Sequence, residues 1–335
     1  MRAAGQRAPI ISVRDLVVRV RDSVGFTTIV DDVSFEIDGG TVFGIAGESG
    51  SGKTMCMKAL LGLLPPGCSA TGKAIFEGAD LLELDQDHLQ KIRGRTMSLV
   101  QQDPSTAFHP MLSIGEQMTD HMRYHLGLSR AECRSRALEL LRDVRIPDPA
   151  GALTAYPHQF SGGMLQRIAI ASAIACGPKV LIADEPTTGL DVTVQAGVLK
   201  LLDDLRRAHD LTIVLITHDL GVMAALADTV AILYAGRVAE IGTREQVLAK
   251  TRHPYTRALL DALPKPRSGQ RRLTPIPGSA ATAGARPPGC AFHPRCSFAA
   301  DACSANIPRL VNVGDGHCHA CTVDPFPANE PLRLQ

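Results

Sequence analysis

A glycine-rich run, GESGSGKT at residues 47 to 54, constrains the fold of this chain more than any other feature. It follows an apolar run of strand type, TVFGIAG, and opens a helical run, KTMCMKALLGLL, that stops at Pro65. Glycines let successive backbone N–H groups turn toward a phosphate, and the start of the helix adds partial positive charge. Lys53 can reach the β- and γ-phosphates, and the Thr54 hydroxyl can bind Mg²⁺. The run therefore predicts a nucleotide phosphate site between a strand and a helix.

Apolar strand-like runs and helical runs alternate through much of the sequence. KVLIADEP and LTIVLITHD are typical of buried parallel strands, and TVQAGVLKLLDDLRRAH between them is helical. Residues 10 to 46 predict strands joined by tight turns, whereas residues 105 to 175 are mostly helical. The pattern predicts an α/β fold whose parallel sheet is covered on both faces, with a helical insertion in the middle.

The charge balance and the composition exclude several classes of protein. The 335 residues carry 35 Lys and Arg against 34 Asp and Glu, and aromatic residues make up only 4%, with no Trp. These values argue against nucleic-acid binding through bulk charge or base stacking. The N-terminal residues have no apolar core of signal-peptide length, so nothing in them predicts export. The most apolar stretch, Leu211 to Ala235, is interrupted by His218, Asp219 and Asp228, which favours a globular core over a membrane span.

Two acidic residues, Asp184 and Glu185, end the apolar run VLIADE. A carboxylate in that position can hold Mg²⁺ through water, and the next one can orient the attacking water. A strand that simply ends in two solvated acids is the alternative interpretation. Kinases of small molecules also carry such loops, so these two motifs predict a P-loop NTPase and no narrower class.

A second candidate anion-binding element is the Ser-Gly-Gly turn in FSGGMLQ, which begins at Phe160 and opens a helix. The alternative is a plain helix cap by Ser161. This turn lies more than a hundred residues beyond the phosphate loop. One way to use both elements is for the second to complete a site on another subunit.

With these motifs in hand, the sequence resembles the ATP-binding subunit of an ABC transporter. GESGSGKT resembles the Walker A loop, FSGGMLQ the signature motif and VLIADE the Walker B strand. Gln102 in VQQDP resembles the Q-loop glutamine, Gly189-Leu190-Asp191 the D-loop, and His218 in ITHD the switch histidine. All six motifs follow the family's order and spacing over residues 10 to 250.

The resemblance implies a fold and a domain division. The fold would be α/β, a RecA-like P-loop NTPase core with an antiparallel β subdomain and a helical subdomain at about 105–175. The ATP-binding domain would span residues 1–264. The signature has Phe for the usual Leu and Met for the usual Gln, and neither change removes Ser161 or Gly163.

The resemblance also implies a role for each motif residue. Glu185 would polarise the attacking water, and His218 would contact the γ-phosphate. Phe26 could stack on adenine, although a strand-edge or core aromatic is an equal alternative. The phosphates would be held by Gly47, Ser49, Gly50, Ser51, Gly52 and Lys53. The Mg²⁺ shell would be formed by Thr54, Gln102 and Asp184. The residues acting across a head-to-tail dimer on the partner's ATP would be Ser161, Gly163 and Asp191.

Five of the nine cysteines fall in the last 46 residues, after a stretch rich in Pro, Gly, Ala, Ser and Arg that predicts a linker at residues 265–289. A terminal group of thiols without an export signal predicts a metal site rather than disulfides. The spacing alone leaves Zn²⁺ open, because His293, His317 and His319 lie nearby. A cysteine-rich tail without metal is the third alternative.

The C-terminal region resembles the tail of oligopeptide/dipeptide importer ATPases in HPYTRALLDALPKP, PPGCAFHPRCSFAADAC and GHCHAC. Members of this branch carry a [4Fe–4S] cluster there, with a structural role. The resemblance therefore implies a cysteine-rich C-terminal extension at residues 290–335. Cys318 falls outside the pattern. The residues that match the four ligands, with five, six and seventeen residues between them, are Cys290, Cys296, Cys303 and Cys321.

The resemblance further implies an assembly and a location. The subunit would lie on the cytoplasmic face of the cell membrane and energise the uptake of di- and oligopeptides. Its partners would be two membrane-spanning permease subunits, a second, related ATPase subunit and an external solute-binding protein, with no nucleic acid. Nickel, glutathione, opines or oligosaccharides are alternative solutes. A soluble ABC ATPase acting on ribosomes or DNA and a small-molecule kinase are alternatives from other classes.

Overall fold

The computed structural model describes residues 9–23, 25–263 and 275–326. Residues 265–274 of the predicted linker and 327–335 of the predicted extension lie outside the described residues. The chain divides into two compact units. None of the described helices is both long and apolar enough to cross a membrane.

The first unit, here the helical unit, consists of residues 38–42 and 83–216 of the described chain. Its strands lie in the order β8-β7-β6, and both neighbouring pairs are parallel. The strands are β6 (Met97–Val100), β7 (Val180–Asp184) and β8 (Thr212–Thr217). Every residue of β7 and β8 is buried, as the two apolar runs predict.

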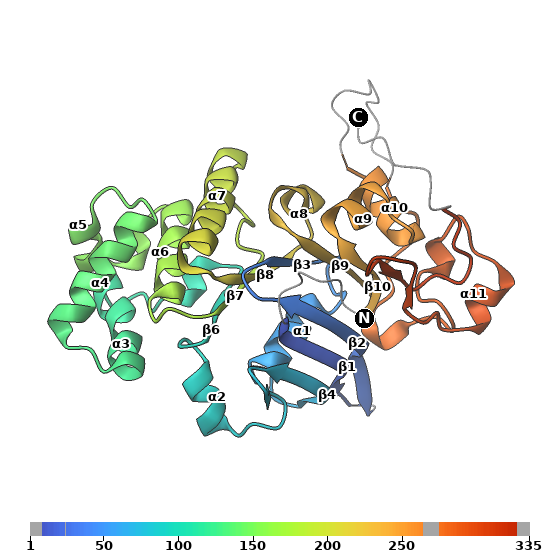
Figure 1. The fold of residues 1–335 in the computed structure, drawn as a ribbon, viewed down its shortest axis with the longest axis horizontal. Helices are drawn as coiled ribbons and strands as arrows, with labels where there is room; N and C mark the ends of the chain where they lie inside the picture. Colours follow the sequence, from blue (N-terminus) through green and yellow to red (C-terminus); the bar gives the residue numbers. More distant parts are fainter. Residues whose placement is uncertain (1–8, 24, 264–274, 327–335) are drawn as a thin grey trace. The chain divides into compact units, whose positions relative to one another are not determined.

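Helices make up most of the helical unit, and side chains fix where several of them begin (Figure 1). Ser113 and Ser129 each accept a hydrogen bond from the backbone N–H of a glutamate three residues later, which closes a capping box. The helices are α2 (Gln86–Ile92), α3 (Ile114–Leu126), α4 (Arg130–Asp143), α5 (Pro149–Thr154), α6 (Gly162–Ile174) and α7 (Val192–His209), with single turns η1 (Pro104–Ala107) and η2 (Pro157–Gln159). Contacts of α3 with α4 and α5, and of α4 with α6, bury the apolar faces of these helices.

The second unit, here the loop unit, consists of residues 9–37, 43–82 and 217–326 of the described chain. One of its sheets has the order β2-β1-β4-β5, and its strands lie side by side in Figure 1. These strands are β1 (Pro9–Arg21), β2 (Phe26–Asp38), β4 (Cys68–Phe76) and β5 (Ala79–Asp80). The β1–β4 and β4–β5 pairs are antiparallel.

The loop unit also holds five strands in the order β11-β12-β10-β9-β3. They are β3 (Val42–Ala46), β9 (Thr229–Tyr234), β10 (Arg237–Thr243), β11 (Val311–Asn312) and β12 (Cys318–His319). β3 and β9 are parallel, and the other pairs are antiparallel. The helices of this unit are α1 (Lys53–Leu60), α8 (Leu220–Leu226), α9 (Arg244–Ala249), α10 (Pro254–Asp261) and α11 (Asp301–Ala305), with single turns η3 (Ala283–Ala285) and η4 (His293–Arg295).

A buried carboxylate attaches the C-terminal segment to the strand beside it. Glu240 of β10 is 0% exposed. It accepts hydrogen bonds from the Thr251 hydroxyl at 2.6 Å and from the backbone N–H of Arg252 at 2.6 Å and His253 at 3.3 Å. The fourth partner, His317 Nε2 at 2.8 Å, comes from the turn before β12. The carboxylate therefore joins β10 to the turn before α10 and, across 77 residues, to the turn before β12.

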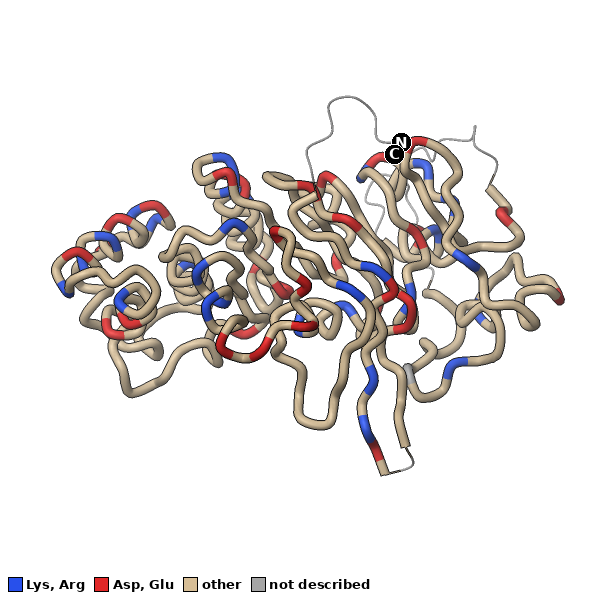
Figure 2. The backbone as a smooth tube through the Cα atoms, turned by 60° about the horizontal axis from the view of Figure 1, so that its bottom comes forward, with Lys and Arg blue, Asp and Glu red and all other residues tan. Residues whose placement is uncertain are grey.

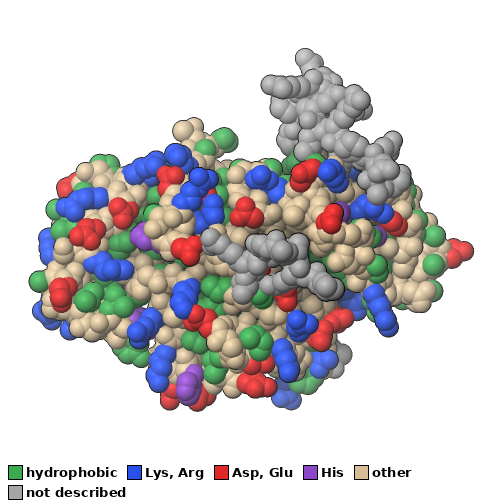
Figure 3. Space-filling view, in the orientation of Figure 1, with side chains coloured by type: hydrophobic (Ala, Val, Ile, Leu, Met, Phe, Trp, Pro, Cys, Tyr) green, Lys and Arg blue, Asp and Glu red, His purple; other side chains and the backbone are tan. Residues whose placement is uncertain are grey.

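Charged residues of both signs occur in both units of the described chain. Lys and Arg, and Asp and Glu, are spread along the described backbone (Figure 2), although five acidic residues and no Lys or Arg lie between Lys73 and Lys91. On the face drawn in Figure 3, side chains of both signs lie among apolar and uncharged ones.

Candidate functional site

The predicted phosphate loop lies between β3 and α1, and its backbone needs glycine. Gly47, Gly50 and Gly52 have φ of 147°, 77° and 98°, values that favour glycine. A Cβ on Gly47 would overlap the Leu233 carbonyl oxygen. Lys53 is buried, and its Nζ donates to the carbonyl oxygens of Gly47 at 2.8 Å and Glu48 at 3.0 Å. The loop is thus wrapped around the lysine ammonium group.

Two features of this loop fit an anionic ligand. Gly52 caps α1 without any side-chain hydrogen bond to the first turn. The Ser51 hydroxyl is buried and has no hydrogen-bond partner among the described residues. A buried hydroxyl without a partner is costly, so these groups suit a phosphate oxygen.

Contacts from distant segments hold the outside of the loop. The Tyr255 hydroxyl accepts a hydrogen bond from the Glu48 N–H at 2.9 Å, and the Gly236 N–H donates to the Ser51 carbonyl at 2.9 Å. Burial raises the pKa of Tyr255, which therefore stays neutral. The Glu48 carboxylate pairs with Arg295. Sequence reasoning missed Tyr255 and Arg295, because no motif marks a residue that contacts the loop from outside.

In the helical unit, the structure brings Gln102 and Glu185 together although 83 residues separate them. Gln102 Nε2 donates to Glu185 Oε2 at 2.9 Å, and the Thr188 hydroxyl donates to the same oxygen at 2.9 Å. Asp184 ends β7 directly before this glutamate. Glu185 has φ of 46°, a left-handed conformation that is uncommon for a residue with a side chain and recurs at functional sites.

The signature residues have local structural roles as well. Ser161 caps α6 by accepting a hydrogen bond from the Met164 N–H at 3.4 Å. A Cβ on Gly163 would overlap Val194 Cγ1, so glycine is needed where α6 packs on α7. Asp191 caps α7 by accepting from the Thr193 and Val194 N–H groups, both at 3.0 Å. Ser161 and Asp191 are exposed.

Two further residues of the predicted ATP site, His218 and Phe26, belong to the loop unit. His218 lies between β8 and α8 and is exposed. Phe26, at the start of β2, is 66% exposed. This exposure excludes the core interpretation of Phe26 and leaves the strand-edge and adenine-stacking interpretations.

The four cysteines of the predicted cluster line one small cavity of about 10 Å³. The pocket is also lined by Phe292 and Phe298. Burial is the main cause that raises the pKa of three of these thiols, which favours their neutral form unless a cation stabilises the thiolates. The described residues nevertheless contain no group of three or more His, Cys, Asp or Glu side chains arranged to hold a metal ion. The thiols are Cys290, Cys296, Cys303 and Cys321, whereas Cys318 does not line the pocket.

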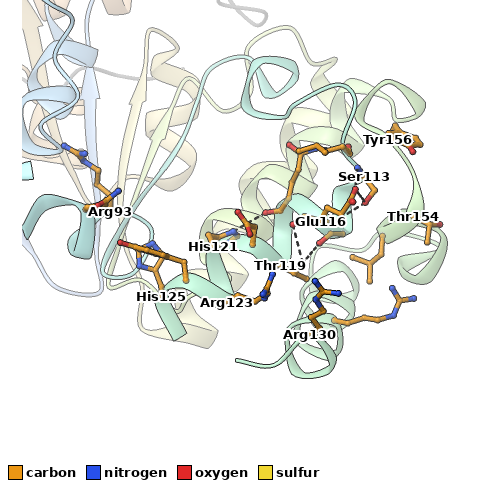
Figure 4. A pocket seen from close by; sticks show the side chains of 18 residues that line it. Arg93, Ser113, Glu116, Thr119, His121, Arg123, His125, Arg130, Thr154 and Tyr156 are labelled. Carbon is orange, nitrogen blue, oxygen red and sulfur yellow. Dashed lines mark hydrogen bonds between the residues drawn. The ribbon is translucent and has the colours of Figure 1, made fainter. Parts of the chain in front are cut away.

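A groove of about 1590 Å³ lies in the helical unit (Figure 4). Residues of α2, α3 and α4 and the C-terminal end of α5 line it. Ser113, Glu116 and Thr119 of α3 lie on one side of it, and Arg123 and Arg130 lie near the α3–α4 turn. Exposed apolar residues lie in or beside it, with Met111 75% and Tyr124 66% exposed. Most of the side chains that line the groove are polar or charged, and Leu112 and Leu153 are the aliphatic ones among them.

Comparison with known proteins identifies the family. Residues 30–188 match the ABC transporter family, and residues 239–303 match the C-terminal region of oligopeptide/dipeptide transporters. The chain is 42% identical to the oligopeptide transport ATP-binding protein OppD of Haemophilus influenzae, over 93% of this chain and 97% of that protein. The chain belongs to the oligopeptide/dipeptide transport ATP-binding family of ABC transporters. The dipeptide transport ATP-binding protein DppD of Escherichia coli is also 42% identical, over 93% of this chain and 96% of that protein.

Solved structures support the same assignment for the ATP-binding part. A dimeric, post-hydrolysis ATP-binding cassette with bound ADP and phosphate has a TM-score of 0.63 and 27% identity, over 70% of this chain and 98% of that one. The family, the α/β cassette fold and the ATPase activity expected from the sequence are thus confirmed.

Proposed function

We propose that this ABC ATPase drives the import of di- and oligopeptides across the cytoplasmic membrane, working from its cytoplasmic face. The observation that carries the proposal is the length of the similarity, which continues past the ATP-binding cassette into the region matched at residues 239–303. The relatives that share this region are named for oligopeptide and dipeptide transport. Nickel, glutathione, opine and oligosaccharide import are the alternatives that the experiment must separate.

The experiment uses the complete transporter with its own external solute-binding protein. We expect ATP hydrolysis to rise when the binding protein carries a di- or oligopeptide, because closure of the ATPase subunits is coupled to substrate arrival. The ligand that co-purifies with the binding protein identifies the solute independently. Stimulation by Ni²⁺ or an oligosaccharide, with none by peptides, would contradict the peptide assignment.

For catalysis, we infer that the phosphate loop and the two acids act on one ATP, an inference supported by the order and spacing of the six motifs. Lys53, the loop N–H groups and the Ser51 hydroxyl bind phosphate oxygens, and Glu185 Oε1 or Oε2 accepts a hydrogen bond from the attacking water. The hydrogen bonds from Gln102 and Thr188 fix the orientation of this carboxylate. His218 contacts the γ-phosphate. The oxygen donors of Thr54, Gln102 and Asp184 suit Mg²⁺ and would hold it, and the bound ion would neutralise phosphate charge.

A second ATPase subunit, of a related but distinct sequence, completes each site in this proposal. Ser161 at the exposed start of α6, with Gly163 and Asp191, acts on the partner's ATP. Val192, the neighbour of Asp191, is 82% exposed, which is unusual for a branched apolar side chain and suits a surface that becomes covered. The similar solved cassette bound to ADP and phosphate is dimeric.

The groove in Figure 4 is the proposed docking surface for a cytoplasmic segment of a permease subunit. Tyr124→Glu places a charge on the apolar part of this surface, so we expect permease co-purification to fall by about tenfold, which corresponds to roughly 1.4 kcal/mol. ATP affinity of the separate subunit should not change. Ile307→Glu, which alters an apolar residue 55% exposed in the C-terminal segment, is the control. Equal permease recovery with both variants would contradict the docking surface.

We propose that the four thiols around the C-terminal pocket bind a [4Fe–4S] cluster as thiolates, which would cross-link a segment with little core of its own. The pocket that all four thiols line supports this proposal. Protein purified without oxygen should be brown and contain about four irons per chain. Cys296→Ser should lose the colour and the iron, whereas Cys318→Ser should keep both. Colourless protein with stoichiometric zinc would contradict the cluster.

A further inference from the structure

The cysteine-bearing segment reaches the phosphate loop through a buried ion pair. Arg295 belongs to η4, directly before Cys296, and its side chain is only 5% exposed. Its Nη1 donates to Glu48 Oε2 at 2.7 Å and its Nη2 to Glu48 Oε1 at 3.0 Å. Glu48 is the second residue of the phosphate loop. Two parallel hydrogen bonds fix both the position and the orientation of this carboxylate.

The Arg295 guanidinium has little freedom to move. Its Nε donates to the Pro277 carbonyl at 2.8 Å, and its Nη1 also lies 3.3 Å from the Tyr234 hydroxyl. The rings of Tyr234 and Phe292 each have their centroid 5.9 Å from the guanidinium carbon. An arginine guanidinium stays protonated in proteins, so the group that pairs with Glu48 is a cation.

A second arginine of the same segment holds the turn that contacts the loop. Arg286 donates to the Ala235 carbonyl at 2.6 Å and to the Ile29 carbonyl at 3.1 Å. The next residue of that turn, Gly236, donates to the Ser51 carbonyl. The segment therefore supports the phosphate loop at Glu48 directly and at Ser51 through one intervening turn.

The charge of Glu48 explains why such a contact matters for nucleotide binding. A carboxylate within a loop that binds a triphosphate repels the phosphates, and the repulsion is strong where little water screens it. Arg295 neutralises this charge and holds the two carboxylate oxygens in a fixed direction. The loop can then present its N–H groups and Lys53 without an uncompensated negative charge.

We propose that Arg295 is a positioning residue for ATP binding: through its paired hydrogen bonds to Glu48, the C-terminal segment sets the affinity of the phosphate loop for nucleotide. The proposal rests on the function proposed above for that loop. It gives the segment a role in the nucleotide site of its own chain, beyond stabilising the C-terminus.

The test is a double-mutant cycle on the full chain, purified without oxygen, with Mg²⁺ and the non-hydrolysable analogue AMP-PNP as the probe. Arg295→Met should weaken binding by about tenfold, within the usual range for coupling between two sites. Glu48→Gln, which removes the charge that needs compensation, should bind close to wild type. The double variant should bind like Glu48→Gln, because the carboxylate that Arg295 neutralises is gone.

Arg252→Met is the matched control. Arg252 is a largely buried arginine that pairs with Asp324 of the same C-terminal segment and does not contact the phosphate loop. If Arg295 had a merely structural role, Arg252→Met and Arg295→Met would lower the affinity for AMP-PNP equally. Glu48→Gln would then not restore the affinity of Arg295→Met. Either result would overturn the proposal, as would wild-type affinity in Arg295→Met.

Two further variants keep the outcomes separate. If Arg295→Met does not fold, the cycle is repeated with Arg295→Lys, which keeps the charge but not the paired geometry, and rescue by Glu48→Gln is again required. Lys53→Ala tests the phosphate loop itself and should abolish AMP-PNP binding. If Lys53→Ala binds like wild type, the proposed nucleotide site is wrong; if only the Arg295 cycle fails, the positioning role alone is wrong.

Discussion

Replacement of Glu185 by Gln is expected to abolish steady-state ATP hydrolysis and to leave ATP binding intact. The Glu185 carboxylate accepts hydrogen bonds from Gln102 and Thr188, both at the same oxygen, Oε2. An amide of the same shape has no charge and is a poor proton acceptor, so turnover should fall by about 10²–10⁴-fold. Phosphate release by the assembled transporter measures turnover, and equilibrium nucleotide binding to the same sample measures affinity.

Asp204→Asn is the control for a lost carboxylate in the same unit. Asp204 pairs on the surface with Arg145 and Lys200 and belongs to no motif. The ATP turnover of the Asp204→Asn variant should therefore match that of the wild-type protein. Unchanged hydrolysis in Glu185→Gln would refute its assignment as the residue that polarises water. Loss of nucleotide binding in that variant would show that its main role is structural.

Among the variants named here, replacement of Glu240 by Ala is expected to lower the free energy of unfolding the most. The carboxylate is fully buried and accepts from the Thr251 hydroxyl, two backbone N–H groups and His317. Its removal leaves four buried donors without partners, and losses of this kind cost about 3–5 kcal/mol. A large drop in the thermal unfolding midpoint should follow, together with early cleavage of the C-terminal segment in limited proteolysis.

Two matched variants test the cause of this loss. Glu240→Gln keeps one carbonyl acceptor and should lie between Glu240→Ala and wild type. Glu245→Gln changes an exposed glutamate on α9 that pairs with Lys250, and it should stay close to wild type. If Glu240→Ala unfolds at the wild-type midpoint, the buried carboxylate does not hold the C-terminal segment in place.

Local sequence patterns predict much of this structure. The phosphate loop lies between a strand and a helix, as its glycines and flanking apolar runs indicate. VLIAD and TIVLIT are buried strands because unbroken apolar runs suit a sheet covered on both faces. These features depend on residues close together in the sequence, where propensity and periodicity apply.

Such local patterns do not predict contacts between segments that are distant in the sequence. The Gln102–Glu185 hydrogen bond spans 83 residues, and the Arg295–Glu48 pair spans 247. Arg295 stands in a run of Pro, Cys and Arg that has no periodicity, so nothing in the sequence marks it as a partner of the loop. The pairing of β12 with β10 is similar, because two residues are too few to show strand alternation.

The central claim is that ATP lies between the phosphate loop of one subunit and the Ser161 end of α6 of its neighbour. The most direct measurement is an experimental structure of the assembled transporter that carries Glu185→Gln, with ATP and Mg²⁺ bound. We predict that the Ser161 hydroxyl and the Gly163 N–H lie within hydrogen-bonding distance of the γ-phosphate bound to the partner's loop. A structure with ATP on the loop and α6 directed away from every phosphate would contradict the account.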